Sequence, residues 1–300
     1  MNAGMPPPLP RARRPVLRGC AVVLGVLLVF FAVFGVVSRI GDAPFVGGGK
    51  VGVLPVNGLI ADSDTTIEHL KRFAKDDSVK AIVVRINSPG GGVGPSQEIY
   101  EEIRKLKGKK PVVSSMGAVA ASGGYYIACG SQKIYANPGT ITGSIGVIMQ
   151  FVNVKDLIEK IGVKGVVVKS GELKDAGSPL RDMTPEERQY LQGVIDNVHA
   201  QFVQAVADGR RLDVDAVRKI ADGRIFSGEQ AKALGLVDAL GDQEDAVADA
   251  ARMAKIEGEP RVVTPPKKKL SILELLREEA KSIIDGNLAG SRLKIDYLAR

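Results

Sequence analysis

Ser122 lies among residues with almost no side chain, in the segment Ala120-Ala121-Ser122-Gly123-Gly124, where a helical pattern begins. A nucleophilic hydroxyl needs such open surroundings so that a carbonyl group can approach it. The N–H groups at the start of a helix can also stabilise the oxyanion that forms. The segment therefore favours a serine nucleophile. A serine that only caps a helix is the alternative interpretation.

A serine nucleophile needs a base, and the chain offers few candidates. Its two histidines, His69 and His199, lie in predicted helices where packing explains them, so a Ser-His-Asp triad is not indicated. Lys174 lies instead in a loop with glycines and a proline, SGELKDAGSP at 170–179. Lysine accepts a proton only when it is neutral, and burial favours the neutral form. Lys174 is thus a candidate base, and an ordinary surface lysine is the alternative.

A second glycine-rich segment, NSPGGG at 87–92, also follows a predicted strand. Sites in α/β sheets form at strand ends, where loops meet helix N-termini. The segment fits neither the phosphate-binding loop nor the dinucleotide spacing. We find no His/Cys/Asp cluster at metal-ligand spacing, so no cofactor or metal is predicted. A purely structural turn is the other interpretation of these glycines.

Apolar strand-like runs alternate with amphipathic helical stretches after residue 50, which predicts an α/β fold with parallel crossover connections. Two further strand-like runs, Ile145–Phe151 and Val163–Lys169, flank a helical one at Asp156–Ile161. From Thr184 the pattern becomes helical. A strong helix start at Thr184 predicts a helix that runs to about Ala207. The other predicted elements are the strands Val51–Val56, Ala81–Ile86 and Val112–Ser115, and the helices Thr65–Ala74, Ser96–Leu106 and Ala121–Cys129.

The N-terminal residues predict a membrane anchor. Residues 1–18 are basic and Pro-rich, and the uncharged apolar run 19–37 would cover about 28 Å as a helix, close to the thickness of a bilayer core. The positive-inside tendency places the arginines before it in the cytoplasm and the rest outside. A cleaved signal peptide is the alternative, but its apolar core is normally shorter.

The remaining boundaries follow from composition. Residues 38–49 form a glycine-rich linker, 50–260 the folded domain and 261–300 a basic tail. The net charge of +7 belongs to the two ends, because residues 50–260 carry 27 Lys/Arg and 28 Asp/Glu. With no Trp as well, nucleic-acid binding is not expected. Cys20 lies in the predicted anchor and Cys129 far downstream in the folded domain, so no disulfide between them is expected. Cys129 is predicted to be a core residue.

These segments, in this order and behind an anchor, resemble the signal peptide peptidase A family, membrane-anchored Ser-Lys proteases of the Clp-protease/crotonase superfamily. The similarity runs from about Val51 to Gly241 and includes Asp222–Arg224 and Leu236–Asp238. It implies a Clp protease/crotonase-like fold of repeated β-β-α units, behind one transmembrane helix. The tail after Pro265 matches poorly.

Matched position by position, the resemblance implies a role for five residues. Ser122 is the nucleophile, Lys174 the general base, and Gly91 and Gly123 the backbone donors of the oxyanion hole. Ser144, in TGSIG at 142–146, contacts the lysine.

The resemblance further implies hydrolysis of remnant signal peptides and other hydrophobic peptides at the outer face of a bacterial cytoplasmic membrane. It implies a homo-oligomeric ring, with an octamer as one candidate size, whose sites are completed across subunit interfaces. The competing hypotheses are a silent ring-forming scaffold and a crotonase-like acyl-CoA enzyme. We also hypothesise that the end Tyr297–Arg300 enters the site and is trimmed.

Overall fold

The computed structural model describes residues 25, 27–31, 49–266 and 296–298. The chain divides into two compact units, Met1–Gly47 and Gly48–Arg300. In the first unit, residue 25 and residues 27–31 are helical, and the rest of the predicted segment 19–37 lies outside the described residues. Within the residues that are described, no helix is both long and apolar enough to span a bilayer.

The second unit is built on a mixed sheet that is parallel over most of its pairs. Strands β1 to β3 form its centre, joined by crossover helices as the alternation of patterns predicts. Two pairs are antiparallel, β5 with β6 and β2 with β9. The main path runs β6-β5-β3-β2-β1-β8, and β4 pairs with both β3 and β7. The strands are β1 (Lys50–Ile60), β2 (Val79–Gly92), β3 (Val112–Ala121), β4 (Lys133–Ala136), β5 (Ile141–Gly143), β6 (Ile225–Ser227), β7 (Ala239–Leu240), β8 (Arg261–Val263) and β9 (Asp296–Leu298).

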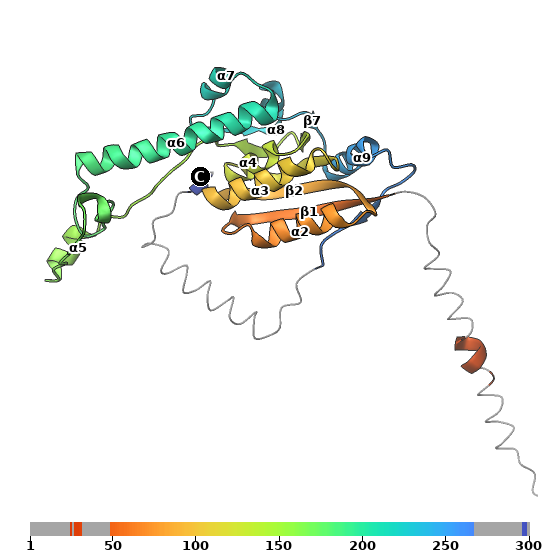
Figure 1. The fold of residues 1–300 in the computed structure, drawn as a ribbon, viewed down its shortest axis with the longest axis horizontal. Coiled ribbons are helices and arrows are strands. Elements are labelled where there is room, and N and C mark those ends of the chain that lie inside the picture. Colours follow the sequence, from red (N-terminus) through yellow and green to blue (C-terminus); the bar gives the residue numbers. More distant parts are fainter. Residues whose placement is uncertain (1–24, 26, 32–48, 267–295, 299–300) are drawn as a thin grey trace, which may run out of the picture. The chain divides into compact units, whose positions relative to one another are not determined.

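Helices cover both faces of this sheet (Figure 1). Helices α2 (Asp64–Lys75), α3 (Val93–Leu106) and α4 (Gly123–Cys129) pack on one face, where they share the larger core cluster with Leu54 and Val56 of β1. Helix α9 (Gln243–Met253) packs on the other face against Val51 and Val53 of the same strand. Alternate side chains of β1 therefore pack into two cores, one on each face of the sheet. This arrangement confirms the predicted α/β class.

The long helix α6 (Pro185–Arg210) begins as the sequence predicts. Thr184 caps it, accepting from the Glu187 amide at 3.2 Å, while the Glu187 carboxylate accepts from the Thr184 amide at 3.0 Å. One face of its C-terminal half is buried, with Phe202 and Val206 fully covered. Two shorter helices, α7 (Val214–Arg218) and α8 (Gly228–Ala233), follow. Apolar packing against the larger core cluster thus holds the C-terminal end of α6.

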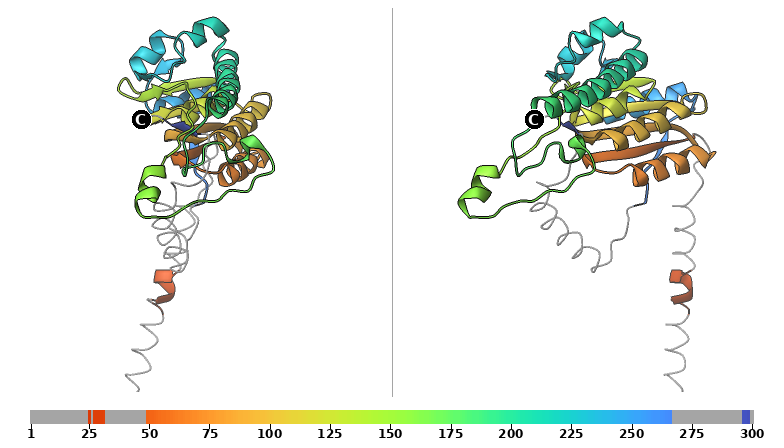
Figure 2. Two further views of the ribbon diagram at one scale, coloured as in Figure 1. Left: turned by 90° about the vertical axis from the view of Figure 1, so that its left-hand side faces the viewer. Right: turned by 60° about the vertical axis from the view of Figure 1, so that its left-hand side comes forward.

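The segment 148–184, which we call the arm, leaves the sheet between β5 and α6 (Figure 2). It contains the short helix α5 (Lys155–Lys160) and the 3-10 turn η1 (Glu172–Asp175), and none of its residues is buried. The predicted strands at Ile145–Phe151 and Val163–Lys169 are wrong. Both runs are rich in apolar residues, but Ile145–Phe151 forms only an isolated bridge, at Ile148, and Val163–Lys169 pairs with no described strand. Val166 and Val168 are 88% and 96% exposed.

Two predicted boundaries shift at the glycine-rich segments. Strand β2 continues through 87–92 instead of ending at Ile86, and β3 continues to Ala121. The helix predicted from Ala121 therefore begins at Gly123. Glycines pair in a sheet as other residues do, so a segment whose composition predicts a loop instead lengthens β2. The longer β2 runs beside the end of β3 that precedes Ser122. Cys129 is fully buried, as expected.

Candidate active site

Ser122 is the single residue between β3 and α4. It has φ 53° and ψ −118°, a combination that non-glycine residues rarely adopt. Such backbone strain persists where the surrounding structure enforces it, and it clusters at functional sites. A strand that turns sharply into a helix at a serine is the arrangement that presents a nucleophilic hydroxyl beside helix N–H groups. Gly123 and Gly124 keep that approach open.

The hydroxyl of Ser122 has no hydrogen-bond partner among the described residues, although the residue is fully buried. Its backbone, in contrast, is fixed on both sides. The Ser122 amide donates to the Gly143 carbonyl at 2.8 Å, and its carbonyl accepts from the Tyr126 amide at 2.9 Å. A buried hydroxyl without a partner is destabilising, so it marks a position that reaction chemistry can use.

Ser144 follows the strand next to that of Ser122. Strands β3 and β5 are parallel, and Ala121 pairs with Gly143, so the two serines leave the sheet at the same edge. Ser144 also has a positive φ, 50°, and its buried backbone amide donates to the Arg224 carbonyl at 2.8 Å. The fold therefore brings Ser122 and Ser144 together, as the predicted site requires.

The glycine-rich end of β2 borders the same edge. Ser88 pairs with Ala120, and a Cβ added at Gly124 would lie 2.9 Å from the Ser88 carbonyl oxygen. At Gly91 an added Cβ would lie 2.3 Å from the Ile60 carbonyl oxygen, so only glycine fits there. The segments that carry Gly91 and Gly123, the predicted oxyanion-hole donors, therefore lie side by side next to Ser122.

Strand β9 lies along this glycine edge. It is antiparallel to β2, with Gly90 opposite Leu298, Gly91 opposite Tyr297 and Gly92 opposite Asp296. It also lies close to α4, the helix that begins directly after Ser122. The edge of β2 beside the serine is therefore shaped to accept an extended backbone.

Lys174 lies apart from these residues. It belongs to η1 on the arm, its side chain is exposed, and it makes no hydrogen bond to the Ser122 hydroxyl. The turn that carries it is bonded to the first turn of α6, because Arg181 pairs with both Asp175 and Glu187. Figure 1 shows that this N-terminal end of α6 lies away from α4. One chain thus gathers four of the five predicted site residues and leaves the lysine outside.

Sequence reasoning missed the charged residues around Lys174. Asp175 accepts from Lys169 at 3.0 Å and from Arg181 at 2.9 Å, and these hydrogen bonds hold the pKa of its carboxyl well below the usual range. Arg181 likewise lowers the pKa of Glu187. Their signal in the sequence is only an acid six positions before and another six positions after an arginine, which many surface segments share.

The described residues contain no group of three or more His, Cys, Asp or Glu side chains that could hold a metal ion. His69 lies in α2 and His199 in α6, and the Ser122 hydroxyl bonds to neither. A strained serine between a parallel strand and a helix, with two glycine-rich segments beside it, defines the class of the protein: a serine hydrolase on an α/β sheet.

Comparison with known proteins narrows the class. The model of Peptidase family S49 matches residues 104–257, and the Clp protease model matches residues 58–141. The "Putative protease slr0021" of Synechocystis is 49% identical over 210 residues, which are 69% of this chain and 76% of that protein. The chain therefore belongs to peptidase family S49, the SppA family, and is a serine-type peptidase.

Two other relatives differ in length. The "Putative signal peptide peptidase SppA" of Enterococcus faecium is 42% identical over 212 residues, covering 66% of this chain and 62% of that protein. The "Protease 4" of Salmonella typhi is 41% identical over 220 residues, covering 70% of this chain but 35% of that protein. The chain thus spans less than two thirds of either relative. Its membership of a peptidase family favours proteolysis over the acyl-CoA chemistry considered above.

Proposed function

We propose that this chain is a Ser-Lys endopeptidase that cleaves hydrophobic peptides, including remnant signal peptides, in an extended conformation. The observation that carries the proposal is the unpartnered, buried hydroxyl of Ser122 beside a strand edge that accepts an antiparallel backbone at Gly90–Gly92. Backbone pairing of this kind binds extended peptides with little regard to sequence. Signal peptides are included because the Enterococcus faecium relative is named as a putative signal peptide peptidase.

The reaction would proceed through an acyl-enzyme. Ser122 Oγ attacks the peptide carbonyl while neutral Lys174 accepts the hydroxyl proton, and the N–H groups of Gly91 and Gly123 stabilise the oxyanion. The lysine then gives that proton to the leaving amine. In the second half, Lys174 takes a proton from the water that attacks the ester. It returns that proton to Ser122 Oγ as the ester bond breaks and the peptide leaves with a new carboxyl group. Ser144, at the same sheet edge, would orient the lysine amine.

The lysine that serves Ser122 would belong to a neighbouring copy of the chain. Lys174 is exposed on an arm with no buried residue, and that arm displays valines that are 52–96% exposed at 163, 166, 167 and 168. Apolar surface of this extent in one segment favours burial against a partner. A ring of copies, for which eight is one candidate number, would bury the arm and bring each lysine to the next serine.

Assembly is tested by changing one exposed valine. Val168→Asp should leave the thermal unfolding of the folded unit unchanged, because the side chain touches little in its own chain, and should abolish both assembly and peptidase activity. Light scattering and an activity assay measure the two effects. Lys164→Asp, at an exposed polar position of the same arm, is the control. A fully assembled, active Val168→Asp protein would contradict the proposed interface.

We further propose that residues 19–37 anchor the chain in a bacterial cytoplasmic membrane, with residues 1–18 inside and the peptidase unit outside. The support is the uncharged run behind four arginines. After expression in a bacterium, the full chain should stay in the membrane pellet through carbonate extraction. Protease added to spheroplasts should degrade the peptidase unit. Recovery in the soluble fraction, or protection from that protease, would contradict the proposal.

The mechanism is tested by paired substitutions. Ser122→Ala and Lys174→Ala should each lower kcat/KM on an apolar peptide by at least ~100-fold, because each removes a group that acts in the transition state. Lys164→Ala, an exposed lysine of the same arm, is the matched control and should be as active as the unmodified chain. Ser144→Ala should retain a measurable fraction of activity. Full activity of Lys174→Ala would remove it from the mechanism, and an unlabelled Ser122 under a serine-directed acylating probe would favour a silent scaffold.

The hypothesis that Tyr297–Arg300 is trimmed gains support from the pairing of β9 with Gly90–Gly92. Mass spectrometry of the unmodified chain and of Ser122→Ala tests it. A shorter C-terminus that requires Ser122 is expected, and identical intact C-termini in both proteins would contradict self-processing.

A further inference from the structure

Arg181 is the most highly bonded side chain of the arm. Its Nε donates to Asp175 Oδ2 at 2.9 Å, and its Nη1 donates to Glu187 Oε2 at 2.9 Å and to the Asp182 carbonyl at 3.1 Å. Its Nη2 donates to the Asp175 carbonyl at 3.2 Å and contacts the second oxygen of each carboxylate. All three nitrogens of the guanidinium are therefore engaged, in the planar fork geometry that gives arginine its directional strength.

The two carboxylates that Arg181 joins belong to different kinds of structure. Asp175 is the residue after Lys174 and ends η1, whereas Glu187 is buried in the first turn of α6 and closes its capping box with Thr184. Because the other end of α6 packs into the core, Glu187 is a fixed point. Arg181 therefore ties the turn that carries the lysine to a helix that the core holds in place.

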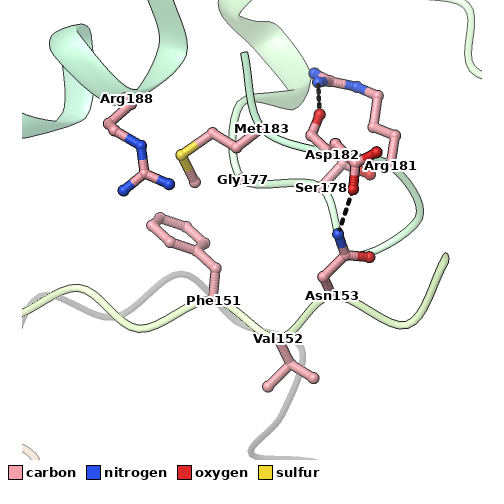
Figure 3. A pocket seen from close by; sticks show the side chains of 9 residues that line it. All are labelled: Phe151, Val152, Asn153, Gly177, Ser178, Arg181, Asp182, Met183 and Arg188. Carbon is pink, nitrogen blue, oxygen red and sulfur yellow. Dashed lines mark hydrogen bonds between the residues drawn. The ribbon is translucent and has the colours of Figure 1, made fainter. Parts of the chain in front are cut away.

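The turn is held from its other side as well. Lys169 Nζ donates to the Glu172 carbonyl at 2.9 Å and to Asp175 Oδ1 at 3.0 Å. Close by, a Cβ at Gly177 would lie 2.3 Å from the Phe151 ring, so that ring packs directly on the backbone after η1. Figure 3 shows Phe151 and Gly177 in a pocket of about 430 Å³ that Arg181 and Asp182 also line.

Lys174 differs from every neighbour in this network. Its amide donates to the Gly171 carbonyl at 3.1 Å, but its side chain makes no hydrogen bond or ion pair among the described residues. The network fixes the backbone on both sides of the lysine and leaves the amine free to reach outward. Since the arm has no apolar core, charge-assisted hydrogen bonds are what set the position of that backbone.

We propose that Arg181 is a positioning residue for Lys174. By joining Asp175 to Glu187, it holds η1 in the orientation that lets the amine reach Ser122. This inference rests on the proposed function, because it takes Lys174 to be the base. Arg181 itself touches no reacting group. Its loss should therefore act on the turnover step and on the proton transfer, and only weakly on peptide binding.

The experiment compares variants of the full chain that keep their assembly. Arg181→Ala should lower kcat by about 10- to 100-fold with KM changed less than about threefold, since small misplacements of a reacting group carry penalties of that size. The acidic midpoint of its pH-activity profile should move upward by about 0.5–1 unit, because a lysine that is no longer held at the site is better solvated and stays charged to higher pH.

Arg181→Lys keeps the charge but cannot bridge two carboxylates, so it should recover only part of kcat. Asp175→Asn is the second, milder variant, in case Arg181→Ala disturbs the arm as a whole. It keeps the shape of the side chain and should shift kcat and the midpoint in the same direction. Lys155→Ala is the matched control. It breaks the ion pair with Asp182, at 2.7 Å in the same arm, without touching η1, and should keep the unmodified kcat and pH profile.

A purely structural role predicts a different result. The fraction of sites titrated by an acylating probe would fall, while kcat for each titrated site and the pH midpoint stayed constant. That outcome overturns the positioning role, and so does an unchanged kcat in Arg181→Ala. Lys174→Ala distinguishes the two failures. If it is inactive while Arg181→Ala and Asp175→Asn behave as the unmodified chain does, this inference alone is wrong; if it is fully active, the proposed function is wrong.

Discussion

The segment that carries Ser122 and the arm that carries Lys174 are held by different forces. Around Ser122 the fixed elements are parallel strands between two apolar cores, and the residue is fully buried. Within the arm that carries Lys174 no residue is buried, and a set of ion pairs and hydrogen bonds sets the backbone. A core position is specified within one chain, whereas an exposed arm can be specified completely only by what it touches. Folding of one chain therefore positions Ser122, the proposed nucleophile, whereas assembly would bring the proposed base, Lys174, to it.

We expect the strongest loss of activity from a change at the buried serine. Ser122→Ala removes a hydroxyl that makes no hydrogen bond, so folding and assembly should be unchanged while peptide cleavage falls to background. Thermal unfolding, light scattering and a peptide assay measure the three properties. Residual cleavage above that of a mock preparation would show that another residue supplies the nucleophile.

The next prediction tests whether the lysine base comes from the same chain as Ser122 or from a neighbouring chain. Ser122→Ala and Lys174→Ala are each expected to be inactive alone, but co-expressed in equal amounts they can combine an intact serine with a neighbour's intact lysine. Random mixing gives about one quarter of the sites this composition, and hence about one quarter of the unmodified activity. Activity that stays at background in a mixed assembly, whose composition mass spectrometry verifies, would place both groups in one chain.

The sequence predicts the elements around Ser122 well, because the patterns that identify them are local. Small residues around Ser122, glycines after the strands and the apolar period of α3 each depend on neighbours in the chain. Even there, composition misplaces the ends of β2 and β3, since it cannot show that a partner strand continues through the glycines.

The arm escapes such reasoning for a physical reason. A run such as Val163–Lys169 has the composition of a strand, and a strand needs a partner that the described part of the chain does not provide. The bridge from Asp175 through Arg181 to Glu187 is equally invisible, because charged residues at such spacings are common and only the folded geometry joins them.

Two glycines near the sheet should respond differently to a substitution by alanine. Gly124 and Gly94 both lie in the first turn of a helix, but an added Cβ would lie 2.9 Å from the Ser88 carbonyl oxygen at Gly124 and would meet nothing within 4 Å at Gly94. Gly124→Ala should lower the free energy of unfolding by roughly 1–3 kcal/mol through overpacking and should reduce activity by shifting the two glycine segments apart. Gly94→Ala is the control and should be neutral or stabilising by up to about 1 kcal/mol through helix propensity. Denaturant unfolding measures both, and equal effects would contradict the tight packing beside Ser122.

The smallest expected effect lies in the arm and depends on acid. Hydrogen bonds from Arg181 lower the pKa of Asp175 and of Glu187 below their ordinary values of 3.8 and 4.5. A lowered carboxyl pKa contributes stability that is fully present above the ordinary value and is lost as the pH falls toward the lowered one. Between pH 6 and pH 3 the arm should therefore begin to loosen, while the strands between the two cores, held by apolar burial, should not.

Hydrogen exchange, expressed as protection factors so that the intrinsic effect of pH is removed, measures this difference. The amides of Lys174, Ala176 and Ser178, which donate within the turns of the arm, should lose protection before those of Val53 and Val83 in the paired strands β1 and β2. Asp222→Asn removes a carboxyl whose pKa Arg224 lowers to about 2 outside the arm, and it should leave the arm's acid response unchanged. Asp175→Asn should loosen the arm already at pH 6, because one end of the bridge has lost its charge. If arm and strands lose protection together as the pH falls, ion pairs do not hold the arm, and the contrast between the two halves of the site disappears.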